Sequence, residues 1–297
     1  GLHPGCVWRN LPAMASEARS VAGRVAHGAV EAGLEVSKLG LGPLMILQGR
    51  RLRGSILRLP EPPGERAGGP ERSDSPGLLF VGDSAMAAVG VAQLGEGFAG
   101  QLLTRLSAGG EAAPRWEMWA QSGLRTQQVA QLVGARLPGR FEVAITSVGV
   151  NDVTSGKGPG IWMRRCEALR RVLRERHGVK QVLMIAVPPM HRFPALPQPL
   201  RGFMGARALS YNAALRRWCA EREDVHCLEI PRPYTPEMIA EDGFHPAGPV
   251  CEALAERAAP LVRRGLVRAA VSEQVDLEQA AVGPSARGCS RQQPEEA

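Results

Sequence analysis

Four short segments of the chain carry the chemical groups that acyl transfer through a covalent serine intermediate requires. Ser84, Gly123 and Asn151 follow three successive apolar runs that we expect to be strands. Asp242 and His245 stand three residues apart, just before the last expected helix. Ligands of a parallel α/β sheet bind beyond the carboxyl ends of its strands, so this placement predicts that the hydroxyl, the two amides and the carboxylate–imidazole pair share one site.

The same segments resemble the sequence blocks of the SGNH hydrolases, which make up the GDSL esterase and lipase superfamily. Each of the four residues that give the family its name has a match here, in the family's order: Ser84, Gly123, Asn151 and His245. The first block ends in Ala85 where the family name has leucine, a position at which the family varies. The resemblance covers about residues 77–265. One block alone is a weak signal, but four in order at expected strand ends are a specific one.

These residues can divide the steps of ester hydrolysis among them. Ser84 is the expected nucleophile, and because a free hydroxyl is a weak one it needs a base within hydrogen-bond reach. His245 is the expected base, and Asp242 is close enough in sequence to fix the tautomer of its ring. The expected oxyanion hole combines the backbone N–H groups of Ser84 and Gly123 with the Asn151 side-chain amide. The family resemblance implies the same roles.

Each segment taken alone also has a structural interpretation. Asp83 can cap a helix and expose Ser84 incidentally, the sequence Asp242-Gly243 is typical of a turn, and Asn151 can cap the segment that follows it. We interpret Asp83 and Asp152 as supports of their loops. The occurrence of all four segments together favours the catalytic interpretation.

The elements that must position these residues follow from the pattern of apolar runs. Strands are predicted at residues 78–81, 115–119, 143–148, 181–187 and 225–230. Helices are predicted within residues 85–106 and at 126–136, 161–176, 205–221 and 247–264. Short apolar strands that alternate with longer helices indicate βαβ units and a sheet covered on both faces. The predicted fold class is α/β, a flavodoxin-like three-layer α/β/α sandwich with a mostly parallel, five-stranded sheet.

Composition divides the chain into four parts. We expect an amino-terminal extension at residues 1–60, a linker at 61–76, the SGNH hydrolase domain at 77–268 and a disordered tail at 269–297. Within the extension, residues 39–58 join a short apolar stretch to four arginines. That stretch is too short to span a bilayer, but it could lie in a membrane surface with the arginines facing anionic head groups. The alternative is that it packs on the body of the protein.

Charge and cysteine content exclude several classes of function. The 297-residue chain is 44% hydrophobic with a net charge of +7, but only three of its 36 basic residues are lysines and the arginines are widely spread. We therefore predict no nucleic-acid partner. The six cysteines lack metal-ligand spacing, and Gly95–Gly100 has dinucleotide-site glycine spacing without a preceding strand, so no metal or organic cofactor is predicted.

The predicted function is hydrolysis of a small-molecule carboxylic ester with a short to medium acyl chain. Residues 188–199 form a proline-rich loop after the fourth strand. Met190, Phe193 and Leu196 in this loop are expected to wall the acyl pocket, and the alternative is an ordinary surface loop. The alternatives for function are a deacetylase of acetylated carbohydrate, a thioesterase, or a catalytically silent binding module. The compartment is not predicted.

Overall fold

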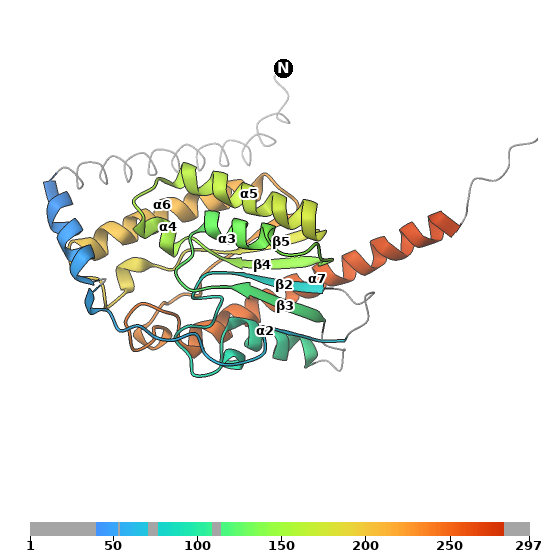
Figure 1. Cartoon of the computed structure of the whole chain (residues 1–297), viewed down its shortest axis with the longest axis horizontal. Coiled ribbons are helices and arrows are strands. Elements are labelled where there is room, and N and C mark those ends of the chain that lie inside the picture. Colours follow the sequence, from blue (N-terminus) through green and yellow to red (C-terminus); the bar gives the residue numbers. More distant parts are fainter. Residues whose placement is uncertain (1–39, 53, 71–76, 109–113, 282–297) are drawn as a thin grey trace, which may run out of the picture.

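The structure is a computed structural model that describes residues 40–52, 54–70, 77–108 and 114–281, with side chains as far as residue 268. Six strands form one sheet in the order β1-β3-β2-β4-β5-β6 (Figure 1). Five of them run parallel to one another. Their bounds are β2 Gly77–Gly82, β3 Arg115–Ala120, β4 Val143–Ser147, β5 Gln181–Ile185 and β6 Val225–Leu228.

The central strands are apolar along almost their whole length because helices cover both faces of the sheet. Every residue of β2 is buried, and so are four of the five residues of β4. Continuous apolar runs of this kind are typical of parallel sheets, whereas one-sided antiparallel sheets alternate apolar and polar residues. The short apolar runs in the sequence therefore predicted the parallel sheet correctly.

Helices form the two outer layers. α2 (Phe98–Ser107) and α7 (Gly248–Ala281) pack together on one face, and α3 (Thr126–Gly134), α5 (Pro159–His177) and α6 (Leu200–Ala220) lie on the other (Figure 1). A short helix, α4 (Val150–Thr154), follows β4, and three 3₁₀ turns lie at Leu94–Glu96 (η1), Met190–Arg192 (η2) and Pro236–Met238 (η3). This arrangement confirms the predicted three-layer α/β fold.

Two parts of the structure differ from the sequence prediction. A sixth strand, β1 (Ala67–Gly68), lies in the expected linker and pairs antiparallel with β3. Two residues carry no hydrophobic periodicity, so the sequence gives no signal for this strand. The second difference is that α7 continues to Ala281, into the tail expected to be disordered from residue 269. The rest of that tail and residues 1–39 lie outside the described residues.

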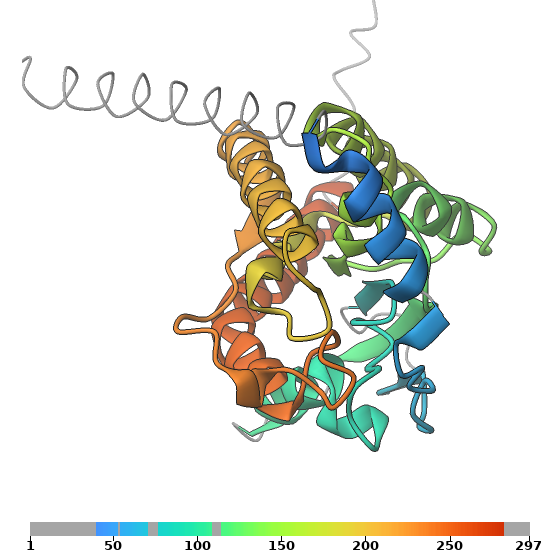
Figure 2. The same ribbon diagram turned by 90° about the vertical axis from the view of Figure 1, so that its left-hand side faces the viewer.

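A further helix covers residues 40–52 and continues at residues 54–55; we call it the 40–55 helix. It lies beside the end of the sheet at which the parallel strands finish (Figures 1 and 2). Met45 is buried against the body of the protein. The Gln48 side chain donates to the carbonyl of Gln198 at 2.7 Å and accepts from the Leu200 N–H at 3.3 Å. One face of the helix is therefore packed, as the second interpretation of this segment predicts.

Candidate active site

The predicted chemical groups come together at the carboxyl end of the sheet. Ser84 lies two residues after β2, Gly123 three residues after β3, and Asn151 in the first turn of α4. His245 lies three residues before α7. Because β2, β3 and β4 are adjacent and parallel, their ends deliver these loops to one edge of the sheet.

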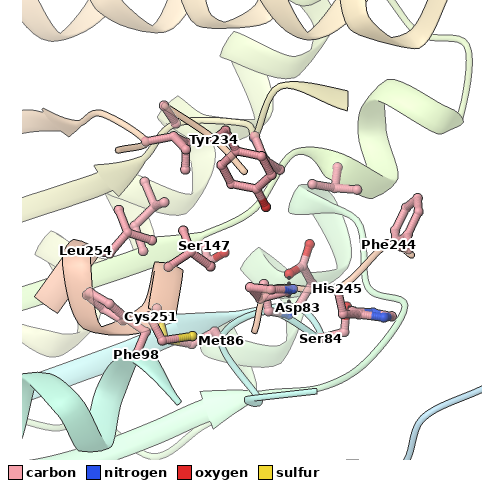
Figure 3. A pocket seen from close by; sticks show the side chains of 18 of the residues that line it. Asp83, Ser84, Met86, Phe98, Ser147, Tyr234, Phe244, His245, Cys251 and Leu254 are labelled. Atoms are coloured by element: carbon pink, nitrogen blue, oxygen red, sulfur yellow. Dashed lines mark hydrogen bonds between the residues drawn. The ribbon is translucent and has the colours of Figure 1, made fainter. Parts of the chain in front are cut away.

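His245 connects Ser84 to Asp242 through both of its ring nitrogens. Its Nε2 lies 2.9 Å from Ser84 Oγ, and its Nδ1 lies 2.5 Å from Asp242 Oδ2 (Figure 3 shows Ser84 and His245). A neutral ring that donates from Nδ1 to the carboxylate is left to accept the Ser84 hydroxyl proton at Nε2. The arrangement can therefore remove a proton from Ser84, which is the step that activates a serine.

The surroundings of Asp242 favour its ionised form. Oδ1 accepts the backbone N–H groups of Phe244 and His245, both at 2.9 Å, while Oδ2 accepts from the His245 ring. Burial raises the pKa of Asp242, but these hydrogen bonds outweigh burial and hold the pKa below its ordinary value. Asp242 is therefore available in its ionised form to accept a hydrogen bond from Nδ1 of a neutral His245 ring.

Gly243 lets the segment between Asp242 and His245 turn sharply. Its φ is +69°, and a Cβ there would lie 2.8 Å from the backbone nitrogen of Ala195. The Ala195 N–H donates to the Gly243 carbonyl at 3.2 Å. The glycine is thus required both by its conformation and by contact with the proline-rich loop.

Asn151 links the loops that carry Ser84 and Gly123. Its side-chain Nδ2 donates to the carbonyl of Leu124 at 3.0 Å and to Asp83 Oδ2 at 3.3 Å. Gly123 has a φ of +80°, and a Cβ there would meet no atom within 4 Å. The positive φ, and not a lack of space for a Cβ, therefore favours glycine at position 123. The three groups expected to form an oxyanion hole therefore lie on neighbouring, directly bonded loops.

Asp152 fixes the loop after β4 to the start of α3. Its carboxylate is buried and accepts from the N–H of Thr126 at 2.9 Å and from its hydroxyl at 2.7 Å. Arg165 donates to the other carboxylate oxygen at 2.8 Å. These contacts give Asp152 the supporting place that its sequence position suggests.

Glu61 supports the Gly123 loop, and the sequence analysis missed it. Its carboxylate accepts from the N–H of Ser122 and from the Arg66 guanidinium, both at 2.7 Å. Arg66 also donates to the carbonyl of Ala120 at 2.9 Å. Burial raises the pKa of Glu61, but the bonds from Ser122 and Arg66 outweigh it and lower the pKa. Residues of the expected linker therefore hold the Gly123 loop in place through hydrogen bonds. No local sequence pattern indicates these contacts.

Asp83 is expected to make the stability of the protein depend on pH. Its carboxyl is fully buried, and burial raises its pKa from 3.8 to about 7. The folded state then binds more protons than the unfolded state between these values, so the free energy of unfolding should fall by about 4 kcal/mol as the pH rises from about 4 to about 7. We expect Asp83→Asn to lack this contribution in denaturant unfolding measured across that range. Identical pH slopes for wild type and variant would contradict the assignment.

Ser84 and His245 lie at one end of an apolar cavity between the sheet and the layer formed by α2 and α7. Figure 3 shows Phe98, Cys251 and Leu254 at the other end. Burial raises the pKa of the Cys251 thiol to about 12, so it is uncharged and a poor nucleophile. The cavity can hold an apolar chain that begins at Ser84.

The proline-rich loop contributes one of its three expected residues to this cavity. Phe193 lines the cavity, and its ring packs edge-on against Phe244 at 5.0 Å between centroids. Met190 and Leu196 do not line it and are buried in the core instead. η2 packs against α6, and Met190 within η2 is buried there.

Within the described residues, no group of three His, Cys, Asp or Glu side chains is placed to hold a metal ion. Cys166, Cys219, Cys227 and Cys251 are free thiols. Cys6 and Cys289 lie outside the described residues.

Comparison with known families agrees with the geometry of the site. The model of the GDSL-like lipase/acylhydrolase family matches residues 80–248, which include Ser84, Gly123, Asn151, Asp242 and His245. The chain belongs to this family. The match confirms the resemblance to SGNH hydrolases and identifies the chain as a GDSL hydrolase by family.

Solved structures share the fold of this GDSL hydrolase. A carbohydrate esterase family 2 enzyme with a carbohydrate-binding domain, from Corynascus thermopiles (Myceliophthora fergusii), is 12% identical with a TM-score of 0.52, over 68% of this chain and 69% of that one. An acetyl esterase mutant solved with an acetate ion is 13% identical with a TM-score of 0.51, over 65% and 99%. A carbohydrate esterase family 3 protein from Talaromyces cellulolyticus is 14% identical with a TM-score of 0.50, again over 65% and 99%. No curated protein matches the chain.

Proposed function

We propose that this GDSL hydrolase is a serine esterase that cleaves carboxylic esters through an acyl-enzyme intermediate. The observation that carries the proposal is the hydrogen-bonded series Asp242–His245–Ser84, which ends at an apolar cavity. Neither Asp83 nor Cys251 competes with Ser84 as the nucleophile, because Asp83 is a buried carboxyl and the Cys251 thiol is protonated. The family match supports hydrolysis of an acyl bond.

In the first half of the reaction, Ser84 Oγ attacks the carbonyl carbon of the ester while His245 Nε2 takes the hydroxyl proton. The carbonyl oxygen becomes an oxyanion, which the N–H groups of Ser84 and Gly123 and the Asn151 amide stabilise. The bond between the carbonyl carbon and the alcohol oxygen then breaks. His245 returns its proton to the alcohol, which leaves, and the acyl group remains on Ser84.

In the second half, water attacks the acyl carbon and gives its proton to His245. The bond to Ser84 Oγ breaks, His245 protonates Ser84, and the carboxylic acid leaves. Asp242 remains ionised throughout and stabilises the imidazolium that forms twice in each cycle.

Asn151 supplies an oxyanion donor in this mechanism only by giving up one of its present contacts. The 3.3 Å contact to Asp83 is the longer of the two, so it is the one exchanged for the oxyanion. We expect Asn151→Ala to lower kcat by about 10²–10³-fold with little change in KM, since the lost bond forms only in the transition state. Steady-state hydrolysis of p-nitrophenyl acetate measures this. Thr154→Ala, on the same short helix, is the control, and a loss below tenfold in Asn151→Ala would remove Asn151 from the oxyanion hole.

The cavity beyond Ser84 is the proposed acyl site. Cys251 and Leu254 of α7 and Phe98 of α2 lie at its far end, so we expect Cys251→Leu to shorten it. The ratio of kcat/KM for p-nitrophenyl hexanoate to that for the acetate should fall by about tenfold or more, because each excluded methylene loses 1–3 kcal/mol of pocket binding. Cys251→Ala, which lengthens the cavity, should not lower the ratio. An equal loss on both esters in Cys251→Leu would place the acyl chain elsewhere.

The same groups could deacetylate a carbohydrate or cleave a thioester. The apolar lining favours an acyl chain over a sugar on the α2–α7 side of Ser84, which leaves the solvent side for the alcohol or thiol. Parallel assays with p-nitrophenyl esters, an acetylated xylo-oligosaccharide and an acyl thioester separate these substrates. Absence of turnover on all three would indicate a silent binding module and contradict the proposal.

A further inference from the structure

The outer face of the 40–55 helix is apolar although it is exposed. Among the described residues, eight large hydrophobic side chains are exposed, and five of them lie in residues 41–57. Leu44 is 45% exposed, Ile46 59% and Leu47 45%, while Met45 between them is buried. A helix that is apolar on all sides is normally covered on all sides. Within the part of the chain that the structure describes, the contacts of this helix lie on the side that carries Met45 and Gln48.

The same segment is strongly basic. Arg50 and Arg51 lie one turn after the exposed apolar residues, Arg58 follows the helix, and all three are exposed. Residues 36–60 contain no aspartate or glutamate. Exposed apolar side chains next to arginines, in a stretch of sequence without acidic residues, match a surface with anionic groups above an apolar layer. A partner protein with an apolar groove would not by itself explain the arginines.

The segment is attached to the rim of the candidate active site. Gln48 bonds to Gln198, near the end of the proline-rich loop, and to Leu200, the first residue of α6. The same loop carries Phe193 of the cavity. Figure 2 shows the helix beside the carboxyl end of the sheet. A surface that binds the helix would therefore lie beside the opening to Ser84.

We propose that the 40–55 helix together with Leu57 and Arg58 docks the enzyme on an anionic lipid bilayer. Leu44, Ile46 and Leu47 enter the boundary between head groups and acyl chains, and Arg50, Arg51 and Arg58 bind the lipid phosphates. Among the described residues, no helix is long and apolar enough to cross a membrane, and the docking proposed here uses only the surface of this segment. It goes beyond ester hydrolysis as such, because it does not involve Ser84 or the residues bonded to it.

Co-sedimentation of the full chain with lipid vesicles tests this docking. Wild type should bind phosphatidylcholine vesicles that contain phosphatidylglycerol much better than pure phosphatidylcholine vesicles, and added salt should weaken the binding. Arg50→Ser/Arg51→Ser should weaken partition onto the anionic vesicles by about thirtyfold, taking about 1 kcal/mol per arginine. Ile46→Ser/Leu47→Ser should weaken it by about tenfold or more through lost apolar burial.

Matched variants at the opposite end of the molecule serve as controls. Arg264→Ser/Arg268→Ser removes the same charge from the far part of α7, and Leu137→Ser removes an apolar side chain that is 86% exposed. Both should bind vesicles like wild type, and all variants should hydrolyse a soluble ester normally, so the proposed activity is tested separately. Docking is overturned if wild type does not bind, or if both test variants bind as wild type does. It is also overturned if light scattering shows a dimer that Ile46→Ser/Leu47→Ser dissociates, because a second copy then covers this face.

Discussion

Replacement of Ser84 by alanine should lower kcat for p-nitrophenyl esters by about 10⁴-fold or more, because the proposed acyl intermediate forms on Ser84 Oγ. The variant keeps the cavity and both backbone donors of the proposed oxyanion hole, so KM should change little. His245 would lose its contact to Ser84 Oγ but keep its bond to Asp242. The fold should therefore remain intact, which circular dichroism and denaturant unfolding would verify.

A distant serine provides the control for this experiment. Ser107 lies exposed at the end of α2, and its hydroxyl donates to the carbonyl of Leu103 at 3.1 Å. Ser107→Ala should retain full activity. Hydrolysis that survives in Ser84→Ala would show that another group is the nucleophile, and it would remove the basis of the proposed function.

Asp242→Asn should lower kcat by about 10⁴-fold while preserving the structure of its loop. The remaining Oδ1 can still accept the N–H groups of Phe244 and His245. The new amide, however, would present a donor to His245 Nδ1, so the ring would have to carry its proton on Nε2. In that tautomer His245 cannot accept the proton of Ser84.

Glu241→Gln is the matched control because it removes a carboxylate from the adjacent, exposed position. We expect its kcat and pH profile to equal those of wild type. Activity of Asp242→Asn within tenfold of wild type at neutral pH would contradict the role of Asp242. Normal unfolding behaviour in both variants would exclude a loss of fold as the cause.

The sheet and the positions of the candidate site residues could be predicted because both leave local signals in the sequence. Buried parallel strands read as short apolar runs, as at Leu78–Val81, whose bounds lie within one residue of β2. Polar residues directly after such runs mark strand ends, and this rule located Ser84 and Asn151. Asp242 and His245 were close enough in sequence for their contact to be expected from the chain alone.

The parts that could not be predicted depend on contacts between distant residues. Glu61 lies 61 residues from Ser122, and its segment has the composition of a linker. Cys251 and Leu254 are ordinary apolar positions of a helix, and only the packing of α7 beside α2 makes them cavity residues. Met190 and Leu196 were assigned to the pocket because composition indicates that a loop is apolar but not which way its side chains turn.

The region after Ser84 shows the same limit on a smaller scale. Residues 85–106 are partly helical, as expected, but the sequence pattern did not indicate where the helix begins: a series of turns and η1 precede α2, which starts at Phe98. Ala88 in these turns has a φ of +62°, which a regular helix does not allow. The irregular path leaves Met86 beside Ser84 in the cavity lining.

Covalent labelling with a fluorophosphonate, followed by peptide mapping, tests the role of Ser84 most directly. An activated serine attacks the phosphorus, fluoride leaves, and the phosphonyl group stays on the hydroxyl oxygen as a stable adduct. We predict one adduct per chain, located at Ser84, with labelling lost in Ser84→Ala and strongly slowed in Asp242→Asn. An adduct on another residue, or no adduct on a folded protein that hydrolyses esters, would contradict a mechanism through Ser84.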